Sequence, residues 1–176
     1  MTMKMTMRIL FAISLTLTLL WSCGKKKVKK NCCKITMAIT PSTYNTDSVG
    51  VYVPNAFTPN DDEINDNFGP QLIGINSIDF KIYKGKNKLV FQTTNLTEWW
   101  NGDYDGKTKT GLFRYEIQLT TKHGESLSVE GEFCSLLDQY TDGAGLTHCT
   151  DCQYGDMADP LLGFIYESAE RLEICN

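Results

Sequence analysis

The sequence has few of the residues and motifs on which catalysis usually depends. Among its 176 residues there are two histidines, His123 and His148. It contains no G-x-S-x-G nucleophile motif, no H-E-x-x-H zinc motif and no P-loop. Its paired acidic residues lie in predicted turns, where exposed carboxylates are ordinary. We therefore expect a protein that is not an enzyme and that carries no catalytic cofactor.

An excess of positive charge is also missing, because 21 acidic residues outweigh 17 basic ones and leave a net charge of −4. A nucleic-acid-binding domain would be strongly basic, so no nucleic-acid partner is expected. The charge is unevenly spread: lysines crowd between positions 25 and 34, and acids dominate from Leu136 to the C-terminus. Two readings stay open, namely different neighbours at the two ends, or a solvated tether and a solvated tail.

The N-terminal apolar run is too short to cross a membrane. Lys4 and Arg8 precede an apolar stretch over residues 9–21, and Ser22 and Cys23 follow it. A membrane-spanning helix needs about 20 apolar residues. A basic start, a short apolar stretch and a small residue are typical of a secretory signal peptide, which we predict over residues 1–22.

The segment Leu20-Trp21-Ser22-Cys23 resembles a bacterial lipobox. In that family the cysteine is acylated and becomes the first mature residue, so the resemblance implies a lipid anchor, including palmitate, on Cys23. Several acyl chains would hold the protein stably at the outer membrane, on a face that the sequence leaves open. Residues 23–47 would then be a lipidated, lysine-rich tether. The alternative is an ordinary signal peptide with an incidental cysteine; either way, export permits disulfides.

The middle of the chain alternates apolar and polar residues. Gly, Asn and Asp separate the alternating stretches, which is the pattern of β-strands joined by turns. Strands are predicted at residues 49–53, 78–83, 89–92, 112–119 and 127–133. Short strands at this density favour an all-β fold with a β-sandwich domain over residues 48–135. Residues 136–176 would form an acidic, cysteine-rich extension.

Residues 53–68, VPNAFTPNDDEINDNF, resemble the opening of the gliding-motility-associated C-terminal domain, which also serves as the type B sorting domain of the Bacteroidetes type IX secretion system. That opening reads roughly VPNAFTPNGDGxND-x-F. Later matches lie at residues 80–83, 89–91, 100–102, 106 and 111–115. The resemblance implies an immunoglobulin-like β-sandwich.

Three departures from this family bear on function. Asp61 and Glu63 replace glycines of the family's turn, so the backbone of that turn is expected to differ. The family domain normally ends its protein, whereas this chain continues for about forty residues. Type IX cargo is also normally not a lipoprotein. Together the departures favour a domain that keeps the fold and has lost the sorting role.

The loop over residues 60–66 concentrates oxygen ligands of the kind that Ca²⁺ prefers. It does not match an EF-hand, since Ile64 stands at a ligand position and the turn glycine is missing. The candidate ligands, chosen by the family motif, are Asn60, Asp62, Asn65 and Asp66. The alternative is an Asx-rich turn whose side chains bond their own backbone. A second acidic turn, residues 101–106, is predicted to connect a hairpin.

Six cysteines remain after Cys23, and structural disulfides are the default expectation for an exported chain. The last four could form two bridges that staple the extension to the last strand. Weaker alternatives are a zinc site that includes His148 and a redox-active pair at residues 149 and 152. The six disulfide candidates are Cys32, Cys33, Cys134, Cys149, Cys152 and Cys175.

Three further features of the sequence suggest a short helix, a modified residue and a sugar contact. Apolar residues at 161, 164, 165 and 172 approximate a helical stripe, which predicts a short helix that either binds a partner or folds back on the domain. The tripeptide that contains Ser48 resembles a Bacteroidetes O-glycosylation motif. Trp99 and Trp100 could stack on a sugar, although buried tryptophans are commoner in sandwiches.

The anchor, the sandwich and the missing active site together predict a non-enzymatic outer-membrane lipoprotein. It would be an accessory or scaffolding subunit of a cell-envelope complex for secretion, gliding or outer-membrane assembly, with outer-membrane proteins as partners. One alternative is a calcium- or glycan-binding surface module. Another is type IX secretion cargo.

Overall fold

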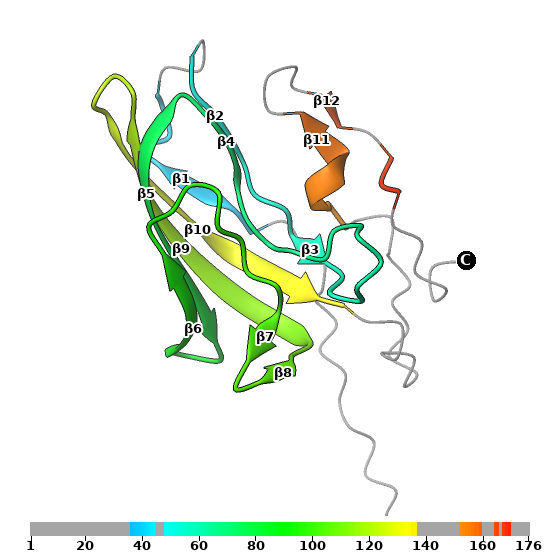
Figure 1. Cartoon of the computed structure of the whole chain (residues 1–176). Coiled ribbons are helices and arrows are strands. Elements are labelled where there is room, and N and C mark those ends of the chain that lie inside the picture. The colour runs from blue at the N-terminus through cyan, green and yellow to red at the C-terminus, as the bar shows by residue number, and fades with distance from the viewer. Residues whose placement is uncertain (1–35, 45–47, 137–151, 160–163, 166, 170–176) are drawn as a thin grey trace, which may run out of the picture.

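The computed structural model describes residues 36–44, 48–136, 152–159, 164–165 and 167–169. These residues form mostly antiparallel β-strands together with the 3₁₀ turn η4 (Gly155–Met157), and they contain no α-helix (Figure 1). In this part of the chain, no helix has the length and apolar character needed to span a bilayer.

The body of the molecule is a six-stranded sheet. Its strands run in the order β1-β10-β9-β5-β6, and β3 pairs in parallel with the end of β10. The bounds are β1 Ala38–Thr40, β3 Ala56–Phe57, β5 Ile75–Lys84, β6 Lys88–Thr93, β9 Gly111–Thr121 and β10 Ser126–Ser135.

Alternation along the long strands gives the sheet one apolar face. On β5, Phe80 and Ile82 are fully buried, whereas Lys81 between them is only half-buried. Phe113, Tyr115 and Ile117 repeat the pattern on β9. Successive side chains of a strand point to opposite faces, so these residues share one face and form the core.

Shorter strands lie over that apolar face. β2 (Gly50–Tyr52) and β4 (Gln71–Ile73) pair antiparallel and cross the sheet (Figure 1). Asp105-Gly106 joins β7 (Asp103–Tyr104) to β8 (Lys107–Thr108), and both turn residues have positive φ, as a two-residue hairpin favours. β11 (Ala158–Asp159) pairs with β12 (Phe164–Ile165).

Phe133 lies at the centre of the aromatic core. Its ring is stacked on Phe68 with a centroid distance of 3.5 Å and contacts the ring of Trp100 edge-on at 6.1 Å. Opposite Tyr115 in the β-ladder stands Gly131, where a Cβ would lie 2.5 Å from the tyrosine hydroxyl. Burial raises the pKa of Tyr115. The core therefore depends on large aromatic side chains and on a glycine that makes room for one of them.

The five strands predicted from the alternating pattern are confirmed as β2, β5, β6, β9 and β10, and the predicted hairpin at residues 101–106 is confirmed as β7–β8. β1 was not predicted, and it lies within the stretch expected to be tether. The helix predicted near residues 161–172 is wrong at Phe164 and Ile165, which form β12. Pairing with β11 overrides a weak helical pattern there, and aromatic and β-branched residues favour strands. The two-layer immunoglobulin-like sandwich stays a prediction.

Candidate functional site

The loop over residues 60–67, hereafter the Asn/Asp loop, is folded around the carboxylate of Asp66. Asp66 Oδ1 accepts hydrogen bonds from the backbone N–H of Asn60 at 2.9 Å and of Asp61 at 2.7 Å, and Oδ2 accepts one from the N–H of Glu63 at 2.7 Å. One carboxylate thus satisfies three backbone donors that no strand pairs.

Two smaller turns complete the loop. Asp62 Oδ1 accepts from the N–H of Ile64 at 2.9 Å, and Asn60 Oδ1 accepts from the N–H of Asp62 at 3.3 Å. Asn60 Nδ2 also donates to Asp62 Oδ2 at 3.0 Å. These are the contacts of an Asx-rich turn.

Glycine is not needed for this loop to adopt left-handed backbone conformations. Asp61 has a φ of 65° and Glu63 a φ of 70°, and Asn65 follows at 50°. Asp61 and Glu63 are the two positions at which glycines of the related domain have been replaced. The hydrogen bonds to Asp66 hold the strained conformation that glycine would adopt without strain.

The structure places the four predicted calcium ligands in one loop, and calcium binding there stays a prediction. The oxygens of Asp62 and Asp66 bond the backbone of the loop, and the Asn65 amide bonds the extension. Within the described ranges, no group of three or more His, Cys, Asp or Glu residues is arranged to hold a metal ion. The Asx-turn alternative accounts for the contacts that are seen.

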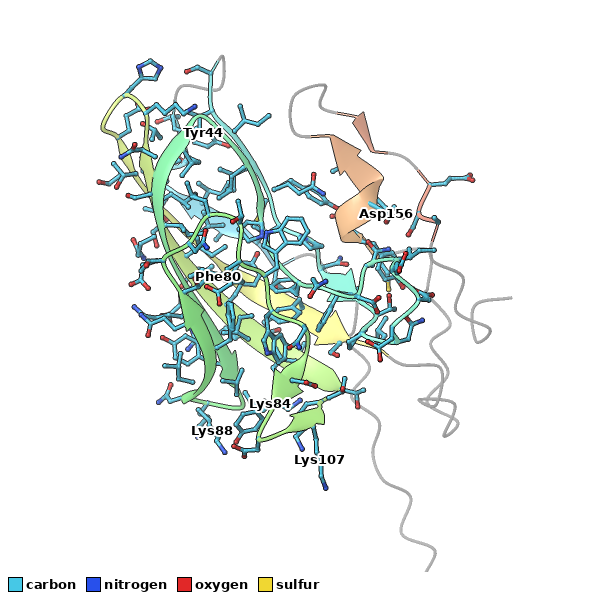
Figure 2. The ribbon with its side chains drawn as sticks, viewed as in Figure 1. Tyr44, Phe80, Lys84, Lys88, Lys107 and Asp156 are labelled. Atoms are coloured by element: carbon cyan, nitrogen blue, oxygen red, sulfur yellow. The ribbon has the colours of Figure 1, made fainter. Side chains whose placement is uncertain are left out.

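The C-terminal extension packs against this loop through Asn65, Asp156 and Ser168. Asn65 Nδ2 donates to Asp156 Oδ1 at 3.0 Å, and the N–H of Asp156 donates back to Asn65 Oδ1 at 3.0 Å. Ser168 Oγ donates to Asp156 Oδ1 at 2.8 Å, and the N–H of Ala169 donates to Oδ2 at 2.7 Å. Asp156 lies on the extension where it approaches the loop (Figure 2).

Backbone contacts fix the extension beside β3. The N–H of Asn55 donates to the carbonyl of Gln153 at 2.9 Å, and the N–H of Gln153 donates to Asn55 Oδ1 at 2.6 Å. Tyr52 donates its hydroxyl proton to the carbonyl of Tyr154 at 2.8 Å. Burial and the nearby Asp156 carboxylate raise the pKa of Tyr52 to about 12.

A second apolar cluster lies beneath these hydrogen bonds. It joins the end of β10 to the extension, and its buried members are Ala56, Cys134, Leu136, Cys152 and Tyr154. Cys134 and Cys152 are disulfide-bonded. How the six candidate cysteines pair stays a prediction, since Cys32, Cys33, Cys149 and Cys175 lie outside the described residues, as do Cys23 and His148.

A pocket of about 550 Å³ opens where the Asn/Asp loop, Trp99 and the extension meet. Its lining residues are Glu63, Asn65, Asp66, Asn67, Gln71, Trp99, Gly155 and Asp156. The two tryptophans differ sharply: Trp100 is buried and donates its indole N–H to the carbonyl of Asp103 at 2.9 Å, whereas Trp99 is 43% exposed at the pocket. Sequence reasoning did not separate them, although adjacent residues on an extended chain point to opposite sides.

The predicted glycosylation residue Ser48 is half-buried. Its Oγ is buried and has no hydrogen-bond partner within the described part of the chain. Glycosylation of Ser48 stays a prediction.

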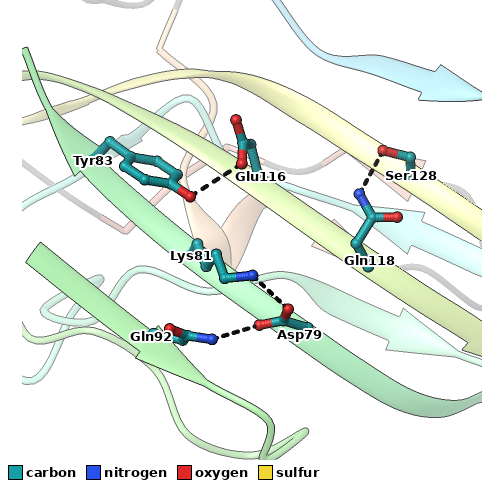
Figure 3. A network of polar contacts seen from close by, with 7 residues as sticks. All are labelled: Asp79, Lys81, Tyr83, Gln92, Glu116, Gln118 and Ser128. Atoms are coloured by element: carbon teal, nitrogen blue, oxygen red, sulfur yellow. Dashed lines mark hydrogen bonds and ion pairs between the residues drawn. The ribbon is translucent and has the colours of Figure 1, made fainter. Parts of the chain in front are cut away.

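The outer face of the main sheet is polar (Figure 3). Lys81 Nζ donates to Asp79 at 2.6 Å, and this hydrogen bond lowers the pKa of the Asp79 carboxyl. Tyr83 donates to Glu116 at 3.1 Å, and Arg114 also pairs with Glu116, which lowers the pKa of that carboxyl. The side chains of this network are partly exposed to solvent.

The fold and the site define a β-sheet domain whose opening loop is clamped by a carboxylate and covered by a C-terminal extension. Residues 51–131 match the family model of the CHU_C type IX secretion signal domain, and this part of the chain is therefore similar to domains of that kind. The match begins in β2 and ends within β10. No curated protein and no solved structure matches the chain.

Proposed function

We propose that residues 51–131 act as a type IX secretion signal and that the chain is cargo carried across the outer membrane to the cell surface. The observation that carries this proposal is the family match, which takes in the Asn/Asp loop, all of β5 and β9 and the first six residues of β10. The expected loss of the sorting role has no support in this match. The intact loop backbone, with left-handed residues where the related domain has glycine, is consistent with a working signal.

The test is export of the full chain from a bacterium that has a type IX system, compared with an isogenic strain that lacks its outer-membrane channel. We expect the chain to be digested by external protease on intact cells of the first strain and to be protected in the second. The variant Phe133→Ala disrupts the core and should lower the surface fraction, whereas Leu89→Ala, at an exposed position on β6, should not. Equal surface fractions in the two strains would refute the proposal.

A second candidate is a lipid-anchored accessory subunit of an envelope complex, held through Cys23. One structural observation favours it: the extension packs on the Asn/Asp loop through Asp156 and on β3 through Gln153, so this surface of the domain is already covered within the chain. Metabolic labelling with a clickable palmitate analogue separates the two candidates. The subunit is favoured if the parent chain is labelled, stays in the envelope and copurifies with integral membrane proteins, and if Cys23→Ala is not labelled. An unlabelled parent chain at the cell surface would favour cargo.

A further inference from the structure

Trp99 is held as a flat platform at the wall of the pocket. Its neighbour Trp100 exchanges two backbone hydrogen bonds with Phe68, at 2.7 and 2.9 Å, which fixes the chain at this point. A Cβ at Gly69 would lie 2.3 Å from the Trp99 ring, so glycine is the residue that lets the indole rest directly on the backbone. Much of Trp99 stays exposed, which gives the pocket a rigid aromatic surface.

The opposite walls are rigid because their side chains are already bonded. Asp66 holds three backbone N–H groups, Asp156 is bonded to Asn65 and Ser168, and Gln71 donates to the carbonyl of Gly155. None of these walls would need to reorganise on binding, and preorganisation lowers the cost of association.

Three polar groups at the pocket are unengaged. The Glu63 carboxylate, the Asn67 amide and the Trp99 indole N–H have no hydrogen-bond partner among the residues that the structure describes, and all three residues line the pocket. The Glu63 carboxylate can accept hydrogen bonds, the Asn67 amide can both donate and accept them, and the Trp99 indole N–H can donate one. Unengaged groups of both kinds beside an aromatic face are suited to a ligand that has hydroxyl groups and an apolar ring face.

The charges select among ligand classes. Glu63, Asp66 and Asp156 disfavour an anion, and the amides disfavour a purely apolar ligand. The Asp66 and Asp156 carboxylates already accept hydrogen bonds from groups of the protein. Among the described pocket residues this leaves Glu63 as the one open carboxylate, which is a weak basis for binding an organic cation. We propose that this pocket binds a neutral saccharide, with a sugar ring stacked on Trp99 and its hydroxyls bonded to Glu63 and Asn67.

The size of the pocket agrees with this proposal. Its volume of about 550 Å³ lies within the range of roughly 300–1,000 Å³ that is usual for small-molecule sites. Because the wall that carries Gly155 and Asp156 belongs to the extension, the site is complete only when the extension is docked. The proposal does not depend on type IX secretion, and the binding experiment below is independent of export.

The test is titration of the ¹⁵N-labelled full chain, in detergent, with the methyl glycosides of glucose, galactose, mannose and N-acetylglucosamine. The indole N–H resonance of Trp99 reports binding, and that of Trp100 serves as an internal reference. At least one glycoside should shift the Trp99 signal with a dissociation constant in the millimolar range. Trp99→Ala should weaken binding at least tenfold, measured on backbone signals of the loop, or about 1.4 kcal/mol.

Two milder variants keep the test decisive if Trp99→Ala folds poorly. Trp99→Phe should retain part of the affinity, and Glu63→Gln should lower it about threefold, since one charge-assisted hydrogen bond is weakened. Leu89→Ala, which also alters an exposed apolar side chain but far from the pocket lining, should bind like the parent. The absence of any Trp99 shift with all four glycosides would overturn the proposal, and so would salt-sensitive binding of tetramethylammonium without binding of sugars.

Discussion

At the residue scale, the Asp66 carboxylate stabilises left-handed backbone conformations in the Asn/Asp loop, which in many turns are adopted by glycine. A left-handed residue other than glycine costs about 1–2 kcal/mol, and Asp61, Glu63 and Asn65 all adopt this conformation. Three hydrogen bonds to one carboxylate offset that strain. The acidic composition of the loop could be recognised from the sequence. The hydrogen bonds that Asp66 accepts could not be predicted, because their donors are backbone N–H groups, which are the same for nearly every residue type.

We expect Glu63→Gly to stabilise the protein by about 0.5–1 kcal/mol, because glycine relieves the positive φ and the bond from the N–H to Asp66 is kept. Urea denaturation measures the change. The matched control is Gly85→Ala, also at positive φ and in open space, which should destabilise by about 1 kcal/mol. A loss of stability in Glu63→Gly would show that the side chain has a role that the loop geometry does not reveal.

Tyr52 should make stability depend on alkaline pH. Its pKa is raised from 10.0 to about 12 in the folded state, so the hydroxyl is protonated more readily there than in the unfolded chain. The stabilisation is therefore complete below pH 10 and is lost as the pH rises toward about 12. Tyr52→Phe should show a shallower fall in the urea midpoint over this window. Tyr115, whose pKa is also raised, should account for the dependence that remains.

At the scale of the elements, the sheet was the most predictable part of the fold. β5, β9 and β10 carry an alternation of apolar and polar residues over most of their length, which indicates the buried face. β1 and β12 were missed because each is two or three residues long, and such strands exist only through their partners. The contact between the extension and the Asn/Asp loop was also invisible, since it joins residues about ninety positions apart.

Replacing Phe133 tests the aromatic core. Phe133→Ala should lower the free energy of unfolding by about 3–5 kcal/mol, since the ring touches Phe68, Trp100 and Phe113 and leaves a cavity between them. Leu89→Ala should change it by about 0.5 kcal/mol or less, because that side chain is exposed. Chemical denaturation monitored by circular dichroism makes the comparison, and similar losses in both variants would contradict this description of the core.

A double-mutant cycle tests the docked extension. Asn65→Ala removes both bonds of the reciprocal pair, and Asp156→Ala removes the one that its carboxylate accepts, so the two changes should be less than additive, with a coupling energy of about 0.5–3 kcal/mol. Either single variant should also speed cleavage of the extension by a non-specific protease while the sheet persists. Strict additivity would mean that the two side chains do not depend on each other.

At the scale of the whole molecule, the extension and the domain form one folded unit. Cys134 is the last residue but one of β10, and Cys152 is the first residue of the extension that the structure describes; both are buried and disulfide-bonded. Reduction should therefore lower the melting temperature, with a loss of about 2–5 kcal/mol for a removed native disulfide. Calorimetry with and without reductant measures it, and an unchanged melting temperature would show that packing alone holds the unit together.

The position of β1 has a mechanical consequence. β1 runs antiparallel to β10, and Thr36 Oγ1 accepts the N–H of Glu132 at 2.7 Å, so the chain enters the sheet close to where β10 leaves it. A pulling force applied between these two points would open the β1–β10 ladder one hydrogen bond at a time. The parallel β3–β10 pair lies at the pulled end of β10, at Cys134 and Ser135, so it would bear part of this force from the start. β1, which is held by three residue pairs, is thus the edge strand that such a force would unzip from β10.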